Sequence, residues 1–305
     1  MKRGILIYGV LLILLILGQG LRAPADWASA YCNLHFKLLG FQKKMLEIKD
    51  SRFDQTFSMN YHIAGAGSQI VILHDLSDNV QSWYNIVASL VTDHQVVLME
   101  IDSDEKNVVL DFFLLREALS HLSEHEHSSE RTLIGHGFGA QLILRKSIHQ
   151  SSINKKQEDK IVLINPLGFD RLPEKTFFIP QSLNELARRD ELLRTGSSFK
   201  LINQDRLKFF DNPIYEHLYE QLRFHPLDTN QLKNIQQPVE LIWSANDPFL
   251  MQPELPQNLT ENFANARLEI LKSCGYAPHI ECSEELISLI KYSLSSQSPE
   301  DRKSP

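Results

Sequence analysis

The stretch that decides the fold is Leu133-Ile134-Gly135-His136-Gly137-Phe138-Gly139-Ala140, where an apolar run passes into a helical pattern. It has the frame G-x-X-x-G, with Gly135 and Gly139 flanking Gly137. A strand that turns sharply into a helix leaves no room for side chains at the flanking positions, and it pushes the central residue outward on a strained backbone. The spacing therefore predicts a tight strand-to-helix elbow with Gly137 at its tip.

Strand and helix patterns alternate on both sides of this elbow. We expect strands at 45–48, 57–64, 69–74, 95–101, 131–136, 160–164, 238–243 and 267–271. Helices are predicted at 82–91, 108–122, 139–149 and 284–294. Strands that are apolar on both faces and alternate with helices indicate a mostly parallel sheet covered on two sides, which is an α/β fold. The first two strands have no helix between them, so we expect them to pair antiparallel at one edge.

The same patterns divide the chain into regions. One large domain is expected over residues 45–296, preceded by an amphipathic helix within 23–44 and followed by a polar tail at 297–305. The alternation stops over residues 168–237, which are polar and helical in pattern. We predict that this stretch is a helical insertion over the carboxyl ends of the strands, where such insertions act as lids.

The N-terminal segment, residues 1–22, stands apart in composition. The run Gly4–Leu21 holds no charge and reaches the lower end of the range, about 17–25 residues, that spans the hydrocarbon core of a bilayer. Two interpretations stay open, an uncleaved anchor and a cleaved export signal with Gly18 and Gly20 at the cleavage site. The length of the run favours the anchor. Both interpretations place the domain outside the cytoplasm, and the anchor makes the membrane a partner.

Composition excludes several classes of protein. Of 305 residues, 43% are hydrophobic and 23% are charged, which is typical of a globular protein and not of a disordered or fibrous one. A net charge of -7 argues against a nucleic-acid partner. Three cysteines exclude a disulfide scaffold, and no Cys/His spacing suggests a metal site. Cys274 and Cys282 are candidates for a disulfide if the domain is exported, although two buried thiols are equally compatible.

Over residues 46–294 the sequence resembles the α/β-hydrolase superfamily. The elbow is one of four motifs in the right order; the others are Ile72-Leu73-His74-Asp75, Leu241-Ile242-Trp243-Ser244-Ala245-Asn246-Asp247 and Gly275-Tyr276-Ala277-Pro278-His279-Ile280-Glu281. The similarity is greatest to lipase- and esterase-like members with an N-terminal hydrophobic segment. The resemblance implies a central parallel sheet flanked by helices, a helical lid and a small apolar or acyl ligand beneath it. It implies no cofactor.

The reactive positions of these motifs depart from the family pattern. Family members use a nucleophile at the elbow, a histidine that takes its proton and an acid that orients the histidine. In this chain Gly137 stands at the nucleophile position and Tyr276 at the histidine position, while Asp247 remains at the acid position. Glycine has no nucleophilic atom, and a phenol with an ordinary pKa of about 10 is a poor base near neutrality.

The expected oxyanion hole is altered as well. Asp75 stands where the family's strand-end motif has glycine, and Phe138 would contribute its backbone N–H. A carboxylate there would repel a developing oxyanion. The turn-forming glycines are thus kept while the reactive groups are replaced.

Neighbouring histidines and carboxylates are weaker candidates. His279 could be a displaced base, although packing in its loop is the plainer interpretation. We expect His136 and His74 to be structural, with His74 holding the loop after its strand. Asp75, Asp78 and Asp102 could form a cation site, but scattered carboxylates in loops are more often simply solvated. The turn His125-Glu126-His127 is expected to be exposed and polar, and not a metal site.

Three functional interpretations follow. The first is a non-catalytic relative that serves as a binding or scaffold protein at a membrane or in an exported compartment. The second is a lipase- or esterase-like hydrolase with an unorthodox set of groups such as Asp247 and His279. The third is a decaying copy with no maintained role. The sequence leaves open whether any activity remains.

Overall fold

The computed structural model describes residues 33–50, 52, 54–76, 78–101, 111–124, 131–153, 159–169, 172–193, 207, 209–250 and 252–295. The predictions for residues 1–22, for Asp102, for His125-Glu126-His127 and for the tail at 297–305 lie outside these residues. None of the helices within the described ranges has the length and apolar character needed to cross a membrane.

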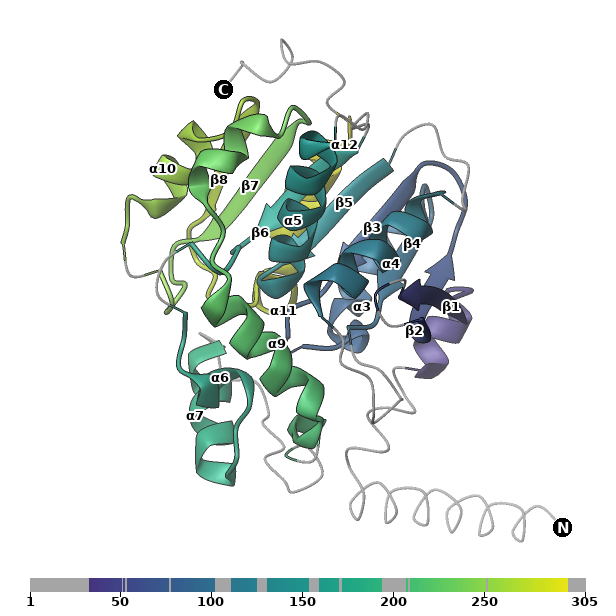
Figure 1. Ribbon diagram of the computed structural model, residues 1–305, viewed down its shortest axis with the longest axis horizontal. Helices are drawn as coiled ribbons and strands as arrows, with labels where there is room; N and C mark the ends of the chain where they lie inside the picture. Colours follow the sequence, from purple (N-terminus) through teal and green to yellow (C-terminus); the bar gives the residue numbers. More distant parts are fainter. Residues whose placement is uncertain are drawn as a thin grey trace, which may run out of the picture.

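The described residues form one eight-stranded sheet in the order β1-β2-β4-β3-β5-β6-β7-β8 (Figure 1). The strands are Gln42–Asp50, Gln55–Ala64, Gln69–Leu73, Gln95–Met99, Arg131–His136, Lys160–Ile164, Val239–Ser244 and Ala266–Leu271, numbered β1 to β8. The strand β2 pairs antiparallel with β1 and β4, and the remaining neighbours pair parallel. The predicted α/β fold, with its antiparallel pair at one edge, is confirmed.

Two helical layers cover the sheet. Helices α4 (Phe112–Glu124) and α5 (Phe138–Ser152) pack on one face, and α3 (Tyr84–Leu90) and α12 (Ser283–Ser295) pack on the other (Figure 1). Alternate residues of β3 enter separate cores: Val71 and Leu73 join the first, whereas Ile70 and Ile72 join the second. This alternation follows from the two-residue period of a strand, and it explains why the strands are apolar throughout.

A group of helices lies between β6 and β7. It contains α6 (Lys175–Phe178), α7 (Leu183–Leu193) and α9 (Pro213–Phe224), followed by the short 3₁₀ helix η3 (Thr229–Asn234). Figure 1 shows α6, α7 and α9 beyond the end of the sheet at which α11 (Pro278–Glu281) also lies. We call residues 168–237 the helical segment, and it occupies the stretch for which a lid was predicted.

The predicted helix within residues 23–44 is wrong at its C-terminal end. The described helical residues end at 38, and β1 has begun by Lys43. Gly40, with φ +84, ends the helix. The N–H of Phe41 donates to the carbonyl of Phe36, and that of Gly40 to Lys37, both at 3.0 Å. These are the paired bonds of the Schellman motif, and the rings of Phe36 and Phe41 supply its usual apolar contact.

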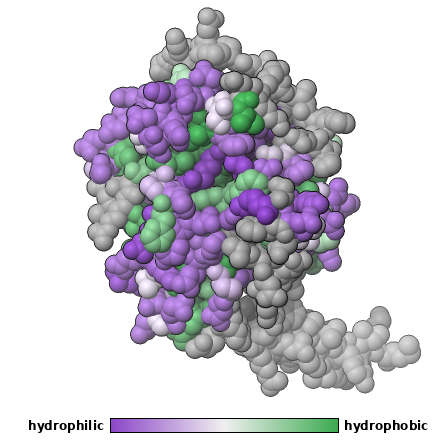
Figure 2. Space-filling view, viewed as in Figure 1, coloured by the Kyte–Doolittle hydropathy of each residue, from purple (hydrophilic) through white to green (hydrophobic). Residues whose placement is uncertain are grey.

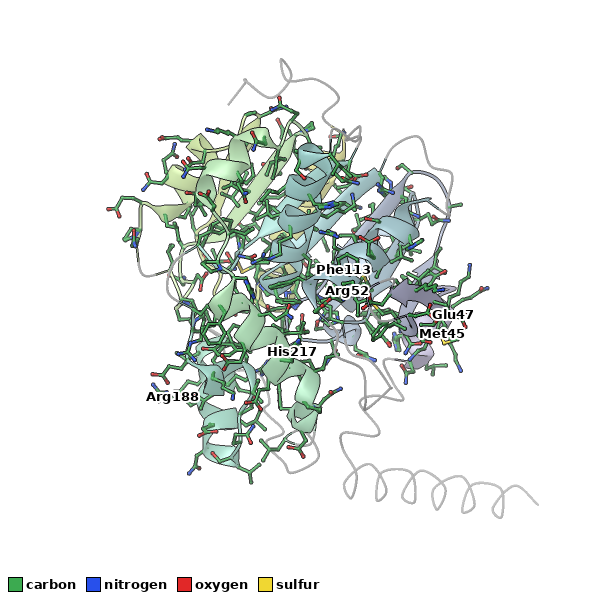
Figure 3. All side chains as sticks on the ribbon, viewed as in Figure 1. Met45, Glu47, Arg52, Phe113, Arg188 and His217 are labelled. Carbon is green, nitrogen blue, oxygen red and sulfur yellow. A yellow bond between two sulfur atoms is a disulfide. The ribbon has the colours of Figure 1, made fainter. Side chains whose placement is uncertain are left out.

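One face of the described surface carries mainly polar side chains (Figure 2). On the face shown in Figure 2, hydrophobic residues are scattered among hydrophilic ones over the described elements. Near the β1–β2 turn, the guanidinium of Arg52 lies 4.0 Å from the centre of the Phe113 ring (Figure 3). It also pairs with Asp111 at 2.7 Å. These contacts join the antiparallel edge of the sheet to α4.

Candidate functional site

The elbow forms as the spacing predicts. The backbone of Gly137, between β5 and α5, has φ 54 and ψ -111. A Cβ atom on Gly135 would lie 2.5 Å from the amide nitrogen of Ala140, and one on Gly139 would lie 2.2 Å from the carbonyl oxygen of Leu73. Both distances are far inside van der Waals contact, so these positions accept only glycine. The tight approach of α5 to β3 and β5 explains the motif.

Four strand ends bring the family-matched positions together. Asp75 follows β3, Gly137 follows β5, Asp247 follows β7 and Tyr276 follows β8. The carboxyl ends of parallel strands meet at one edge of a sheet, where α/β proteins place their sites. Asp75 and Tyr276 are fully buried at that edge.

The carboxylate of Asp75 joins two of these positions. Its Oδ1 accepts a hydrogen bond from the backbone N–H of Phe138 at 2.7 Å. Its Oδ2 accepts another from the hydroxyl of Tyr276 at 3.0 Å. The side chain of Asp75 therefore occupies the position at the start of α5 that an acyl-transfer enzyme keeps for its substrate.

Little space remains at the tip of the elbow. A Cβ atom on Gly137 would lie 2.3 Å from the hydroxyl oxygen of Tyr276 and 2.4 Å from Oδ1 of Asp75. A serine would need both side chains to move. The side chains of Tyr276 and Asp75 therefore fill the space that a side chain at position 137 would need.

Tyr276 acts here as a hydrogen-bond donor. Burial raises its pKa well above the ordinary value, and the negative charges of Asp75 and Asp247 raise it further. Its ring lies edge-on to the rings of Phe177, 5.8 Å away, and Phe249, 5.1 Å away. A phenol held neutral in this way cannot accept a proton from a nucleophile.

Asp247 is buried and oriented without a histidine. Its Oδ1 accepts from the backbone N–H of Phe249 at 2.9 Å, and its Oδ2 accepts from the indole N–H of Trp243 at 3.2 Å. Burial raises the pKa of Asp247 to about 7, although these two hydrogen bonds oppose the rise. The carboxyl group of Asp247 is thus held in place, and it is partly protonated near neutral pH.

His279 lies against a different carboxylate. Its Nε2 is 2.9 Å from Oδ2 of Asp78, and its ring stacks on Trp83 with centres 4.6 Å apart and planes 9° apart. His279 is buried, so its side chain packs inside the protein and does not lie on the surface. Among the described residues, no contact joins His279 to Asp247, so the structure does not pair these two side chains.

The other two histidines tie backbone segments together. Nε2 of His136 donates to the carbonyl of Tyr276 at 2.8 Å. Burial, together with the nearby His279, lowers the pKa of His136 to about 4. Nδ1 of His74 donates to the carbonyl of Asp75 at 2.8 Å. These contacts agree with the structural roles expected for both residues.

The sequence reasoning missed Asn165, which follows β6. Its Nδ2 donates to the carbonyl of Tyr276 at 2.9 Å and to the hydroxyl of Ser244 at 3.1 Å, while its Oδ1 accepts from the N–H of Ser244. Asn165 has φ 41, a left-handed conformation that asparagine tolerates better than most residues. Asparagine followed by proline at the end of a buried strand was the available signal.

A cavity of about 920 Å³ opens beside this site. It lies among α6, α7, α9 and the loop after β7, and Arg188, which lines it, is labelled on α7 in Figure 3. Phe177 and Phe249 line the cavity and also contact Tyr276. These two rings therefore stand between the cavity and the elbow.

Both apolar and charged side chains line the cavity. Leucine, proline and aromatic side chains form much of its wall. The charged residues on it are Arg188, Arg189, Arg223, Glu174 and Glu185. Two of these arginines already have carboxylate partners: Arg189 lies 3.2 Å from Asp190 and Arg223 lies 3.5 Å from Glu220.

The comparisons with known proteins rest on structure. The sequence matches no protein-family model and no curated protein. A bacterial membrane phospholipase A superposes with a TM-score of 0.75 at 14% identity, covering 100% of both chains. The carboxylesterase CesB of Bacillus subtilis gives 0.66 at 15% identity, covering 92% of this chain and 99% of that one. A thermophilic esterase from Thermogutta terrifontis gives 0.64 at 14% identity, with 82% and 98% covered.

These similarities extend over most of each chain, but at such low sequence identity they show the fold and not the function. They agree with the mostly parallel eight-stranded sheet flanked by helices. The chain has the α/β-hydrolase fold.

Proposed function

We propose that this chain is a non-catalytic protein of the α/β-hydrolase fold that binds an acyl-chain amphiphile with an anionic group in the cavity beside the helical segment. One observation carries the non-catalytic part. The hydroxyl of Tyr276 and the carboxylate of Asp75 fill the space that a side chain at Gly137 would need. Gly137 itself offers no atom on which a covalent acyl intermediate could form, and the two side chains leave no room for one at that position.

The proton-transfer groups support the same conclusion. Tyr276 is held neutral by burial, and its proton is directed to Asp75. His279 lies against Asp78, so no imidazole among the described residues is oriented by Asp247. General-base activation of a nucleophile or water requires such an imidazole or an equivalent base within hydrogen-bond reach.

The chemistry of the cavity supports the ligand class. Its aromatic and aliphatic walls provide apolar area, which favours burial of an acyl chain at about 25 cal/mol per Å². Arg188 and Arg223, exposed on α7 and α9, can pair with a carboxylate or phosphate group. A volume of about 920 Å³ is within the range of small-molecule sites.

The ligand is best identified by extraction from the full-length chain purified in detergent, followed by mass spectrometry. We expect a stoichiometric acyl compound that Arg223→Glu reduces. Lys233→Glu makes the same change of charge at an exposed position on η3, away from the cavity lining, and should retain the ligand. Equal loss in both variants would count against the cavity as the binding site.

Hydrolase activity is the second candidate, and the names of the structural neighbours favour it. The buried Asp247, with its pKa near 7, is the group that would take part. A screen of short- and long-chain p-nitrophenyl esters, together with fluorophosphonate labelling, should be blank under the first proposal. Saturable turnover that Asp247→Ala abolishes would establish the second and overturn the first.

We also propose that the domain lies outside the cytoplasm, held at a membrane or exported. The apolar run Gly4–Leu21 behind Lys2 and Arg3 supports this proposal. A disulfide between Cys274 and Cys282 supports it independently, because such bonds persist in oxidising compartments. Protease accessibility of the full-length chain in intact and lysed cells tests it; complete protection from external protease in cells whose outer barrier has been removed would contradict it.

A further inference from the structure

We propose that Asp78, His136 and His279 bind one divalent transition-metal ion, with zinc as the best match to this set of ligands. The three residues come from separate segments: Asp78 from the loop after β3, His136 from the end of β5 and His279 from α11. Their ligand atoms lie within 4.8 Å of one another. We call these residues the Asp78–His136–His279 cluster.

The imidazole of His136 is already in the form that binds a metal. Its Nε2–H donates to the carbonyl of Tyr276, so the proton of the neutral ring is on Nε2 and Nδ1 carries a lone pair. That Nδ1 is buried and has no hydrogen-bond partner among the described residues. Metal-binding histidines commonly donate their second nitrogen to a backbone carbonyl in this way.

His279 also has ring nitrogens without a hydrogen bond. Nε2 of His279 lies 2.9 Å from Oδ2 of Asp78, which is close enough for an ion pair, but the contact does not form a hydrogen bond. Both ring nitrogens of His279 therefore lack a hydrogen-bond partner in the described structure, although only 1% of the side chain is exposed. Buried polar atoms almost always have a partner, and an ion or ordered water is a usual explanation when the protein offers none.

The indole of Trp83 orients both Asp78 and His279. The indole N–H of Trp83 donates to Oδ2 of Asp78 at 3.1 Å, and the same indole ring stacks on His279. Outer contacts of this kind fix the direction of a ligand's lone pair. The side chain of Asp78 is 13% exposed, so an ion can reach the cluster from solvent.

The dimensions suit a small ion. Zinc binds imidazole nitrogen and carboxylate oxygen at about 2.0–2.2 Å. Atoms within 4.8 Å of one another lie close to the spacing of ligands around one such ion. Two imidazoles and one carboxylate favour zinc or a neighbouring transition metal over magnesium and calcium, which prefer oxygen ligands. Three protein ligands leave a position for water, and the ion would tie the loop of Tyr276 to β5 and to the loop after β3.

The test uses the full-length chain, purified in detergent, stripped with a chelator and dialysed against zinc. Inductively coupled plasma mass spectrometry should find one zinc per chain. Cobalt(II) should give visible absorption bands of a site with nitrogen and oxygen ligands. Asp78→Asn, His136→Gln and His279→Gln should each weaken zinc binding by more than about 100-fold.

His62→Gln is the matched control, because His62 also faces a carboxylate, that of Glu100 at 2.7 Å, outside the cluster. It should leave the stoichiometry unchanged. A folded wild-type chain that takes up no zinc would overturn the proposal and leave buried water as the partner. If the histidine variants fail to fold, Asp78→Asn decides alone: undiminished zinc binding by that folded variant would equally overturn it.

Discussion

The carboxylate of Asp75 accepts a hydrogen bond of 2.7 Å from the backbone N–H of Phe138. In hydrolases of this fold, the amide after the nucleophile faces an oxyanion that exists only during the reaction. In this chain the group that faces this amide is a side chain of the protein itself. The elbow has the geometry of an anion site, and a side chain of the same chain occupies it.

Removing that carboxylate should destabilise the fold. Asp75→Ala leaves two buried donors, the N–H of Phe138 and the hydroxyl of Tyr276, without their acceptor. An unsatisfied buried group costs about 1–3 kcal/mol, so we expect the free energy of unfolding to fall by roughly 2–5 kcal/mol. Urea denaturation of the full-length chain measures this change.

The isosteric Asp75→Asn variant is the control. Its amide oxygen can accept from Phe138 and its amide nitrogen can donate to Tyr276, so its loss should be much smaller. Sodium formate should raise the stability of Asp75→Ala more than sodium chloride does at equal ionic strength, because formate fits the vacated anion position. Equal stability of the alanine and asparagine variants would show that the two hydrogen bonds contribute little.

Restoring a nucleophile alone should not restore chemistry. In Gly137→Ser the new Cβ meets the hydroxyl of Tyr276 and the carboxylate of Asp75. Overpacking of this kind costs about 1–3 kcal/mol, and the melting temperature should drop accordingly. Fluorophosphonate labelling should remain blank.

The clash can be separated from other effects of the substitution by a double-mutant cycle. Asp75→Gly removes one of the two close neighbours, so Gly137→Ser should be less destabilising in that background. Adding Tyr276→His removes the other and supplies a base, and the triple variant should recover some fluorophosphonate labelling. Additive effects of Gly137→Ser and Asp75→Gly on stability would contradict the close contact.

The sequence predicted the parts of this site that the backbone determines. Gly135 and Gly139 are required because α5 approaches β3 and β5 too closely for any Cβ, and that requirement is visible in one short motif. The strands are equally visible, because burial on both faces gives continuous apolar runs. The motifs that follow these strands placed Asp75, Gly137, Asp247 and Tyr276 at one edge of the sheet.

The side-chain partnerships could not be predicted in the same way. The bond between Tyr276 and Asp75 joins residues 201 positions apart. Whether a carboxylate in that loop repels a ligand or bonds to the protein depends on side-chain direction, which no periodicity encodes. The stacking of His279 on Trp83 is a similar case. The end of the N-terminal helix could have been predicted, because Gly40 after an apolar repeat is a recognisable helix stop signal. The prediction missed it because apolar residues continue at helical spacing around Gly40.

Reduction of the disulfide between Cys274 and Cys282 should loosen the loop that carries Tyr276 and His279. The bond closes a loop with a sequence separation of 8. Loop-closure entropy predicts a loss of about 2.5 kcal/mol in the free energy of unfolding for a loop of this size. Denaturation with and without reductant measures it, and mass spectrometry of the alkylated protein checks the thiol count. A Cys274→Ala/Cys282→Ala chain should show no response to reductant; an equal response there would assign the effect elsewhere.

The stability of the protein should depend on pH through Asp247. Burial raises its pKa from 3.8 to about 7, so the folded state holds the proton more tightly than the unfolded state does. The stability that this group contributes is fully present below pH 3.8 and is lost as pH rises toward 7. Each tenfold gain in proton affinity on folding corresponds to about 1.4 kcal/mol, so this raised pKa sets an upper limit of roughly 4 kcal/mol.

Asp247→Asn isolates this contribution because its amide stays neutral at every pH. Urea denaturation of both chains between about pH 4 and pH 8 gives two profiles, and other titrating groups cancel in their difference. Asparagine cannot satisfy both Phe249 and Trp243 with one oxygen, so the variant is expected to be less stable at low pH. As pH rises, the wild type should lose more stability than the variant, so the difference between their free energies of unfolding should become smaller. Parallel profiles would mean that Asp247 is ionised in the folded protein across this range.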